Sequence, residues 1–329
     1  MKICIVKLSA MGDVIHAMVA LEFIKKRFPD SEIDWIIESG FKGVIENNPY
    51  IDNILTLNLK KIKTQKSEIF NQIRLVKRYA KNNYDIIIDA QGLIKSAIVS
   101  KMLKGKNTTL YGFSKNSIRE GVASWFYDEV IAIAYDENTI DRNVTVLCKP
   151  LGIDVTSQNI LEKRIFLYFQ DEDKIALKKE YNLIVIGSTW ESRNYPKEKF
   201  IAVIERLKIP TYIVWGSDEE YEKALWMEKQ SSFLEILPKG NLNTLKSVIA
   251  NAKLLIGNDT GPTHMAWGLN IPSITIFGPT PINRVYITAI NKVIKSSSEV
   301  NHYRLNKNDF SINEIEVEDI VKIAKELLA

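Results

Sequence analysis

The chain has 329 residues, of which 46% are hydrophobic and 26% charged, and its formal net charge is +4. This composition is ordinary for a globular protein, and the length exceeds that of one typical domain, so we expect two domains of roughly 150 residues each. The charge excess is too small to indicate nucleic-acid binding, although it suits an acidic substrate or an anionic membrane surface.

The N-terminus and the cysteines predict a cytoplasmic protein that at most rests on a membrane. The first apolar run breaks at Lys7, which is too early for a signal peptide, and no later segment offers the ~18 uncharged apolar residues of a membrane span. Cys4 and Cys148 form no Cys-x-x-Cys or Cys/His cluster, so two buried thiols in a reducing compartment are expected.

Short β-branched runs alternate with amphipathic stretches along the whole chain, which predicts an α/β fold with a parallel sheet in each half. Helices are expected over 13–27, 243–250 and 315–328, and the break between the halves within 152–173, with domains 1–155 and 156–312. The expected strands are Ile3–Val6, Ile33–Ile37, Ile54–Leu57, Ile86–Asp89, Leu183–Ile186, Tyr212–Trp215, Leu234–Leu237, Leu254–Gly257 and Ser273–Phe277.

The turn from the first strand to the first helix, 7–13, lies at the carboxyl edge of the predicted sheet, where open α/β sheets bind ligands. It carries neither a dinucleotide nor a P-loop glycine fingerprint. It offers one carboxylate, Asp13, at the start of the helix. That residue alone favours two interpretations equally, a helix cap or a general base held in the site.

A second turn, Asn258-Asp259-Thr260-Gly261-Pro262, follows a buried strand and opens a helix. Gly261 lets the backbone approach a ligand, and the N–H groups of a helix start suit a phosphate. His264 falls in the first turn of this helix, so a ligand contact is expected of it. The Asp259 carboxylate would be repelled by a diphosphate, because both are anionic. Asp259 is therefore assigned to fixing the turn or to sugar hydroxyls.

Two more polar loops follow neighbouring strands. The loop with Ser188, Thr189 and Arg193 offers hydroxyls and a cation for a pyrophosphate. The segment 215–220 offers carboxylates, Glu220 among them, that suit ribose hydroxyls. Solvated loops are the simpler interpretation of each, but three polar loops at one sheet edge favour a nucleotide site.

Asp171-Glu172-Asp173 matches the D-x-D string of many metal-dependent sugar transferases. Here the acids open a predicted helix next to the break between the halves, where they stabilise the helix N-terminus. With no His, Cys and Asp cluster elsewhere, no metal is expected.

Taken together, the motifs resemble the ADP-heptose transferases of lipopolysaccharide core assembly, glycosyltransferase family nine, over nearly the whole chain. The most specific motif separates the members that add the first heptose to a Kdo residue on lipid A from those that add the second. The matching segments are Val6–Val14, Asp89-Ala90-Gln91-Gly92-Leu93-Ile94-Lys95-Ser96 (the most specific), Trp215-Gly216, Leu237-Pro238-Lys239, Asp259-Thr260-Gly261 with His264, and Phe277-Gly278-Pro279-Thr280.

The resemblance implies a GT-B fold, two Rossmann-like domains that face each other across a cleft, with the C-terminal helix 313–329 crossing back onto the first. It implies Asp13 as the catalytic base, set against the Asp259 turn, with ADP-heptose as donor, Kdo-lipid A as acceptor, no metal cofactor and transient contact with the cytoplasmic face of the inner membrane. The donor residues it implies are Ser188, Thr189, Arg193, Glu220, Gly240, Asp259, Thr260, Gly261 and His264, and the acceptor residues are Ser9, Gly12, Lys95 and Arg119.

One departure concerns Arg193, because the family usually has Lys before an aromatic-Pro pair, and here Arg193 precedes Asn194-Tyr195-Pro196. An arginine keeps the charge and gains bidentate reach toward a phosphate. The basic segment 60–66 suits an acceptor loop, without a residue-by-residue match.

Three other functions stay open at this point. A nucleotide-dependent oxidoreductase could use Glu38 as its ribose acid, but the first turn lacks the glycine fingerprint. A non-catalytic binder of sugar nucleotides has no need of Asp13. A transferase for another nucleotide sugar is disfavoured by the 89–96 string.

Overall fold

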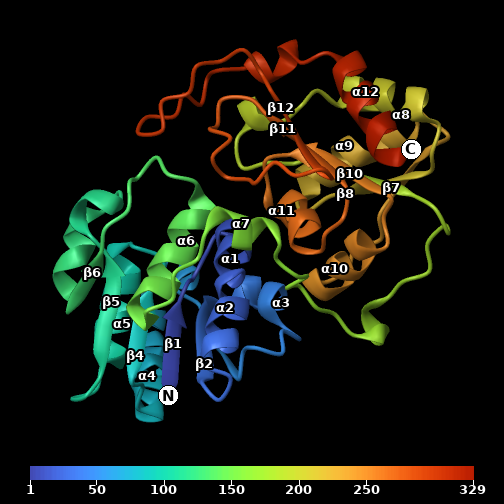
Figure 1. Cartoon of the computed structure of the whole chain (residues 1–329). Helices are drawn as coiled ribbons and strands as arrows, with labels where there is room; N and C mark the ends of the chain where they lie inside the picture. The colour runs from blue at the N-terminus through green and yellow to red at the C-terminus, as the bar shows by residue number, and fades with distance from the viewer. The chain divides into compact units, whose positions relative to one another are not determined.

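A computed structural model describes the whole chain, residues 1–329, as two compact units, Met1–Tyr168 and Phe169–Ala329 (Figure 1). The boundary lies within the range 152–173 predicted for the break, but later than the predicted domain limit at residue 155. The Asn48 side-chain amide donates to the Phe166 carbonyl at 2.9 Å, and Arg164 pairs with Glu22 at 3.6 Å. The segment 156–168 therefore packs on the first unit.

The first unit is a parallel six-stranded sheet in the order β3-β2-β1-β4-β5-β6 with helices on both faces. On one face α1 and α2 pack against α6, and on the other α4 packs against α5 (Figure 1). The strands are β1 (Lys2–Val6), β2 (Glu32–Glu38), β3 (Asn53–Leu57), β4 (Ile86–Asp89), β5 (Thr109–Phe113) and β6 (Glu129–Ile131), and the helices are α1 (Met11–Met18), α2 (Ala20–Arg27), α3 (Lys42–Ile45), α4 (Glu68–Tyr79), α5 (Ile94–Leu103), α6 (Thr139–Cys148) and α7 (Ser157–Leu161).

The second unit repeats this plan with the sheet order β12-β11-β10-β7-β8-β9, again all parallel. Helix α8 packs against α9 and α12, and α10 packs against α11. The strands are β7 (Asn182–Val185), β8 (Thr211–Val214), β9 (Leu234–Ile236), β10 (Leu254–Asn258), β11 (Ser273–Phe277) and β12 (Asn291–Lys295), and the helices are α8 (Lys197–Leu207), α9 (Asp218–Glu228), α10 (Leu242–Ala250), α11 (Gly261–Gly268) and α12 (Val317–Leu328).

Both units have the Rossmann strand order, in which the chain reverses its winding between two central strands. Those strands are β1 and β4 in the first unit, and β7 and β10 in the second. The predicted α/β class with two parallel sheets is confirmed. Buried central strands such as Ile87-Ile88 and Leu254-Leu255-Ile256 are apolar on both faces because helices cover both sides of each sheet.

Three strands escaped prediction because each lies at or beside a sheet edge and has a weak pattern. Strand β6 is three residues long and half exposed, β12 begins and ends with polar residues, and β5 contains Gly112. Edge strands are partly solvated and therefore lack the continuous apolar run that marks a central strand. The single helix predicted over 13–27 is divided at Val19 into α1 and α2.

The expectation that the C-terminal helix crosses back onto the first domain is wrong. Helix α12 packs on α8, and its residues Ile320, Val321 and Ala324 belong to the core of the second unit. The preceding segment is held there too, because the Tyr195 hydroxyl donates to the Ile315 carbonyl at 3.1 Å. The apolar face from which this helix was predicted is buried within the second unit.

The helices are short, and α4 and α12 have 12 residues each. None combines the length and the apolar character that crossing a bilayer requires.

Candidate functional site

In the first unit the turn after β1 and the turn after β4 meet at the switch point of the sheet, where ligands of such folds bind. Asp89 builds the second of these turns. Its fully buried carboxylate accepts hydrogen bonds from the N–H groups of Gln91 at 2.9 Å and Gly92 at 3.2 Å, and from the hydroxyls of Ser96 at 2.8 Å and Tyr127 at 2.9 Å. Burial raises the pKa of Asp89, and these bonds oppose that rise. Asp89 is therefore structural.

Gly92 completes the turn in the left-handed region, with φ +67°, and a Cβ there would lie 2.6 Å from the Ile118 side chain. Only glycine adopts this conformation without strain, and only glycine leaves the Ile118 side chain in its place. The string 89–96 is thus a scaffold whose polar members shape the turn.

Gln91 joins the two turns. Its Oε1 accepts from the backbone N–H groups of Leu8 and Ser9, each at 3.0 Å. Lys7 adds a second link, because its buried Nζ donates to the Ala90 carbonyl at 2.8 Å. Burial lowers the pKa of Lys7, and the nearby carboxylates of Asp13 and Asp89 oppose that change. The β1–α1 turn is fixed from both sides.

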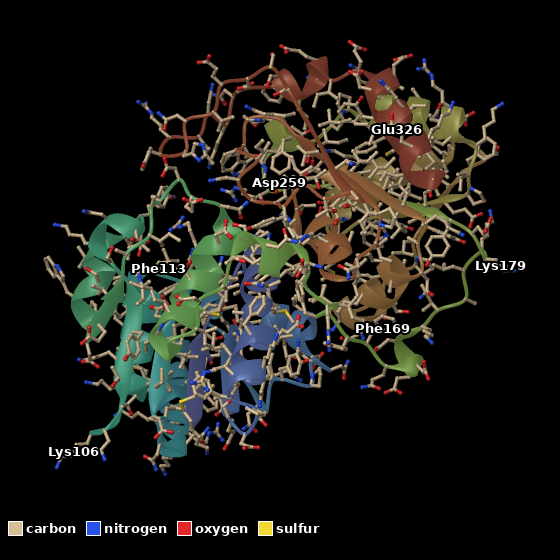
Figure 2. All side chains as sticks on the ribbon, in the orientation of Figure 1. Lys106, Phe113, Phe169, Lys179, Asp259 and Glu326 are labelled. Atoms are coloured by element: carbon tan, nitrogen blue, oxygen red, sulfur yellow. The ribbon has the colours of Figure 1, made fainter.

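Asp13 occupies the third position of α1, where its Oδ2 accepts from the Ala10 N–H at 3.2 Å. It therefore caps the helix, one of the two interpretations left open by the sequence. Asp13 also lines a cavity of about 210 Å³ in the first unit, so capping does not remove it from a ligand's reach. The wall further includes Lys7, Ala90, Gln91, Gly92, Leu93, Phe113 (labelled in Figure 2), Ile118, Arg119, Tyr135, Thr139, Arg142 and Asn143.

Three cations share this cavity with the Asp13 carboxylate: Lys7, Arg119 and Arg142. Arg142 is held by a 2.9 Å bond from Nη1 to the Tyr135 carbonyl, and its guanidinium lies 4.8 Å from the centre of the Tyr135 ring. A cavity with one carboxylate among three cations suits an anionic ligand that also carries a hydroxyl.

The predicted acceptor residues have different positions around this cavity. Arg119 lines it, Gly12 lies beside Asp13 in the first turn of α1, and Ser9 contributes a backbone N–H to Gln91. Lys95 is exposed on the first turn of α5 and does not line the cavity.

Sequence reasoning missed Lys7 and Arg142 as cavity residues. Lys7 carried a signal, since it directly follows a buried apolar strand. Arg142 lies in α6, far from any motif, and only the fold brings it to the switch point.

In the second unit the switch point carries Asp259, which is 2% exposed and labelled in Figure 2. Its Oδ2 accepts from Arg193 Nη2 at 2.7 Å and from the Thr280 hydroxyl at 3.2 Å, and its Oδ1 lies 3.2 Å from His264 Nε2. Burial raises the pKa of Asp259, but His264 and Arg193, with help from Arg284, hold it well below its ordinary value. Asp259 is an ionised anchor of the turn.

Arg193 was expected to face a pyrophosphate, whereas the structure pairs it with Asp259, donating from Nη2 to both the carbonyl and the carboxylate of that residue. Its Nε is buried and has no hydrogen-bond partner within the protein. The hydroxyls of Ser188 and Ser192 in the same loop are likewise buried without a partner. Buried polar groups are normally satisfied, so this loop is built to meet polar atoms of a ligand.

Asn258 ties this loop to the Asp259 turn and was not singled out from the sequence. Its Oδ1 accepts from the Tyr195 N–H at 2.9 Å, and its Nδ2 donates to the Ile186 carbonyl at 3.0 Å. The exposed Thr189 lies in the same loop after β7. Thr260 then serves as the N-cap of α11 and Gly261 as its first residue, which places the N-terminus of this helix at the same switch point.

Glu220 lies in the first turn of α9, and its Oε2 accepts from the Gly216 N–H at 2.6 Å. A Cβ on Gly187 would lie 1.8 Å from Glu220 Oε1, so only glycine in the loop after β7 leaves room for this carboxylate. Glu220 is therefore held at the carboxyl edge of β7. Gly240 lies in the exposed loop before α10, where a Cβ would come within 2.7 Å of Thr244.

The acidic segment 171–173 and the single residue Glu38, both considered in the sequence analysis, have structural roles. Asp171–Asp173 forms a short 3-10 helix in which Asp173 accepts from the Gln170 N–H at 2.8 Å. Glu38 is buried and accepts from the Lys60 N–H at 2.7 Å. No group of three or more His, Cys, Asp or Glu side chains is arranged to hold a metal ion.

Comparison with known proteins identifies relatives over the whole length. The family described as "Glycosyltransferase family 9 (heptosyltransferase)" matches residues 72–312. Lipopolysaccharide heptosyltransferase 1 of Campylobacter coli is 37% identical over 99% of each chain, and that of Escherichia coli K12 is 29% identical over 85% of this chain and 88% of the relative.

Among solved structures, the E. coli heptosyltransferase WaaC with ADP-2-deoxy-2-fluoro heptose matches with a TM-score of 0.81 and 24% identity, covering 99% of each chain. The fold is therefore GT-B.

Proposed function

Because this chain belongs to glycosyltransferase family 9, the heptosyltransferase family, and is a glycosyltransferase, we propose that it moves L-glycero-D-manno-heptose from ADP-heptose to a Kdo residue of Kdo-lipid A. The transfer inverts the anomeric centre and uses no metal. The observation that carries this proposal is the cavity that holds Asp13 among Lys7, Arg119 and Arg142. It combines a proton acceptor with the charges that an anionic sugar requires.

The donor site of the proposal is the switch point of the second unit. The buried hydroxyls of Ser188 and Ser192 and the Arg193 Nε belong to the loop after β7, and Arg193 donates to Asp259 in the turn before α11. Each of these groups, like the N-terminus of α11, suits an oxygen of a diphosphate. Glu220, held over Gly187, is assigned to the ribose hydroxyls. Gly240 in the loop before α10 is assigned to the adenine side.

The acceptor site of the proposal is the cavity of the first unit. Kdo is a sugar acid, so its carboxylate suits Arg119 and the buried Lys7, while its attacking hydroxyl lies against Asp13. The acceptor is a lipid, which requires the protein to work against a membrane. We assign it to the cytoplasmic face of the inner membrane, as a peripheral protein.

The reaction is a single displacement. Asp13 accepts the proton of the acceptor hydroxyl while that oxygen forms a bond to the anomeric carbon, and the bond from that carbon to the diphosphate oxygen breaks. ADP leaves with the electron pair. The charge that develops on the diphosphate is met by Arg193 and the backbone N–H groups of the Thr260-Gly261 turn, whose positions are fixed before the reaction by Asp259 and Asn258.

The direct test is to mix the purified protein with ADP-heptose and Kdo-lipid A in the presence of EDTA and to measure the product mass. We expect one added heptose and the same rate with and without EDTA. UDP-glucose and ADP-glucose serve as control donors and should give no product. Absence of product, or product only after a divalent metal is added, would contradict the proposal.

The position of Glu220 can be tested through Gly187. Gly187→Ala forces the Glu220 carboxylate off the edge of β7, and Glu220→Gln removes its charge. Each change should raise the KM for ADP-heptose about tenfold or more while changing kcat less, because one charge-assisted hydrogen bond to the ribose is lost. Glu219→Gln, one residue away and exposed, is the matched control and should leave the KM unchanged.

A further inference from the structure

The first unit exposes large apolar side chains on one layer, which α4, α5 and the 3-10 helix η5 (Gly121–Phe126) form together. Helix α5 packs against both of the other elements. Trp125 of η5 is 75% exposed and Phe70 of α4 is 69% exposed. The other large apolar side chains exposed on this outer layer are Ile69, Ile94, Ile98 and Val122. Large apolar side chains exposed on neighbouring elements are typical of a contact surface.

The outer layer is also strongly basic. Helix α4 holds Arg74, Lys77 and Arg78 against one acid, Glu68, whereas the whole chain has a net charge of only +4. The segments on either side of α4 add further lysines, which are Lys60, Lys61, Lys63, Lys66 and Lys81. Residues 90–107 add four Lys with no Asp or Glu. A groove of about 610 Å³ along α4 is lined by Asn71, Arg74, Leu75, Lys77, Arg78 and Lys81.

Phe70 and Arg74 are four residues apart on α4, so the aromatic ring and the basic groove share one face of the helix. Aromatic and aliphatic side chains among Lys and Arg are the composition of surfaces that lie on anionic bilayers, where the rings enter the headgroup region and the cations meet phosphates.

The outer layer adjoins the cavity that holds Asp13. Leu93 lines the cavity and directly precedes the exposed Ile94, and the Ile94 N–H donates to the Glu120 carboxylate at 2.8 Å. Arg119, next to Glu120, also lines the cavity. A molecule anchored in a bilayer against this layer therefore has a short path to Asp13.

We propose that the outer layer binds the surface of an anionic phospholipid bilayer, with Trp125 and Phe70 inserted among the headgroups and the cations of α4 and α5 paired with lipid phosphates. The inference rests on the proposed function, since a lipid acceptor held in that bilayer would present its sugar to the Asp13 cavity. An acidic protein is the competing occupant, and the experiment separates the two.

The experiment measures co-sedimentation of the full-length protein with vesicles of phosphatidylcholine alone and of phosphatidylcholine mixed with phosphatidylglycerol. We expect binding to the mixed vesicles, weakened by added salt, and much weaker binding to the neutral ones. The double variant Phe70→Ser/Trp125→Ser should lower the affinity by about tenfold or more, because two interfacial aromatic anchors are lost.

The matched control is Tyr303→Ser, which removes a ring that is 73% exposed on the second unit and should leave vesicle binding unchanged. Thermal unfolding of each variant checks that it folds. Failure of the wild type to bind mixed vesicles, equal binding to both vesicle types, or undiminished binding by the double variant would each overturn the proposal and leave a protein as the occupant.

Turnover separates this inference from the proposed function. With an acceptor that lacks acyl chains, the double variant should keep the wild-type rate, and it should slow only when the acceptor is embedded in vesicles. The wild type could bind mixed vesicles through these two rings and still form no product from any acceptor. That result would support the membrane-binding layer and contradict the proposed reaction.

Discussion

Replacing Asp13 by Asn should lower kcat/KM for heptose transfer by about 10²–10⁴-fold, the usual contribution of a positioned general base. The amide keeps an oxygen that can accept from the Ala10 N–H, as the Asp13 carboxylate does at 3.2 Å, so the start of α1 should remain intact. It cannot accept the proton of the attacking hydroxyl. Initial rates over a range of both substrates, with calorimetric titration of ADP-heptose, check this result.

Donor binding is the internal control for this prediction. Asp13 belongs to the cavity of the first unit, whereas the proposed donor residues lie in the second, so the dissociation constant for ADP-heptose should stay near the wild-type value. Asp30→Asn, an exposed change in the same unit, should leave transfer unaffected. Substantial turnover by the Asp13→Asn variant would mean that Asp13 is only a helix cap.

Replacing Arg193 by Gln should weaken both donor binding and the fold. It leaves the Asp259 carboxylate, 2% exposed, without its nearest cation. Breaking a buried pair by removing one partner typically costs about 3–5 kcal/mol. We expect a loss of that order in the free energy of unfolding at pH 7, measured by urea denaturation, and a rise in the KM for ADP-heptose.

The pH dependence of this loss has a definite sign. The folded-state pKa of Asp259 is held below its ordinary value of 3.8, so its stabilising contribution is complete above that pH and declines as the pH falls further. Without Arg193 the pKa of Asp259 is lowered less, because one of the cations that lower it is lost. The difference in unfolding free energy between wild type and Arg193→Gln should therefore be largest near neutrality and narrow below about pH 4. A constant difference across this range would contradict the assigned pairing.

Two companion variants separate charge from geometry. Arg193→Lys keeps a positive charge at this position, where the family usually has Lys. This variant should therefore lose less donor affinity than Arg193→Gln. The double variant Arg193→Gln/Asp259→Asn removes both charges and should recover part of the lost stability, without recovering donor binding. Equal donor affinity of the Lys and Gln variants would show that the charge of residue 193 does not act on the donor.

Elements near the centre of each sheet were predictable because their signals are local. A run such as Ile86-Ile87-Ile88 is buried on both faces and reads as a strand from its own residues, and the α11 start was visible as Gly261-Pro262 after an apolar run. The turns at strand ends were equally readable, since parallel strands bring their carboxyl ends to one edge. These features specified the α/β class and placed Asp13 and the Asp259 turn at the carboxyl edges of the predicted sheets.

Partnerships between distant residues were decided only by the tertiary structure. Arg193 and Asp259 are separated by 66 positions. The sequence assigned Arg193 to a pyrophosphate and Asp259 to fixing the turn or to sugar hydroxyls, whereas the fold pairs the two residues with each other. Arg142 has no motif and reaches the Asp13 cavity because α6 packs on α1. The partner of α12 is another example, because an apolar helix face shows that burial is needed but not which core supplies it.

The amino-acid sequence by itself determined where the central strands and the turns and helix starts that follow them lie, since these depend on residue type and spacing within a few positions. It thereby determined which polar residues stand at the carboxyl edges of the sheets. The tertiary structure alone decided which of them became ion pairs, scaffold or cavity wall, and that the segment 156–168 packs with the first unit. Such outcomes depend on burial and on charges brought close by chain crossover, and neither is encoded at any single position.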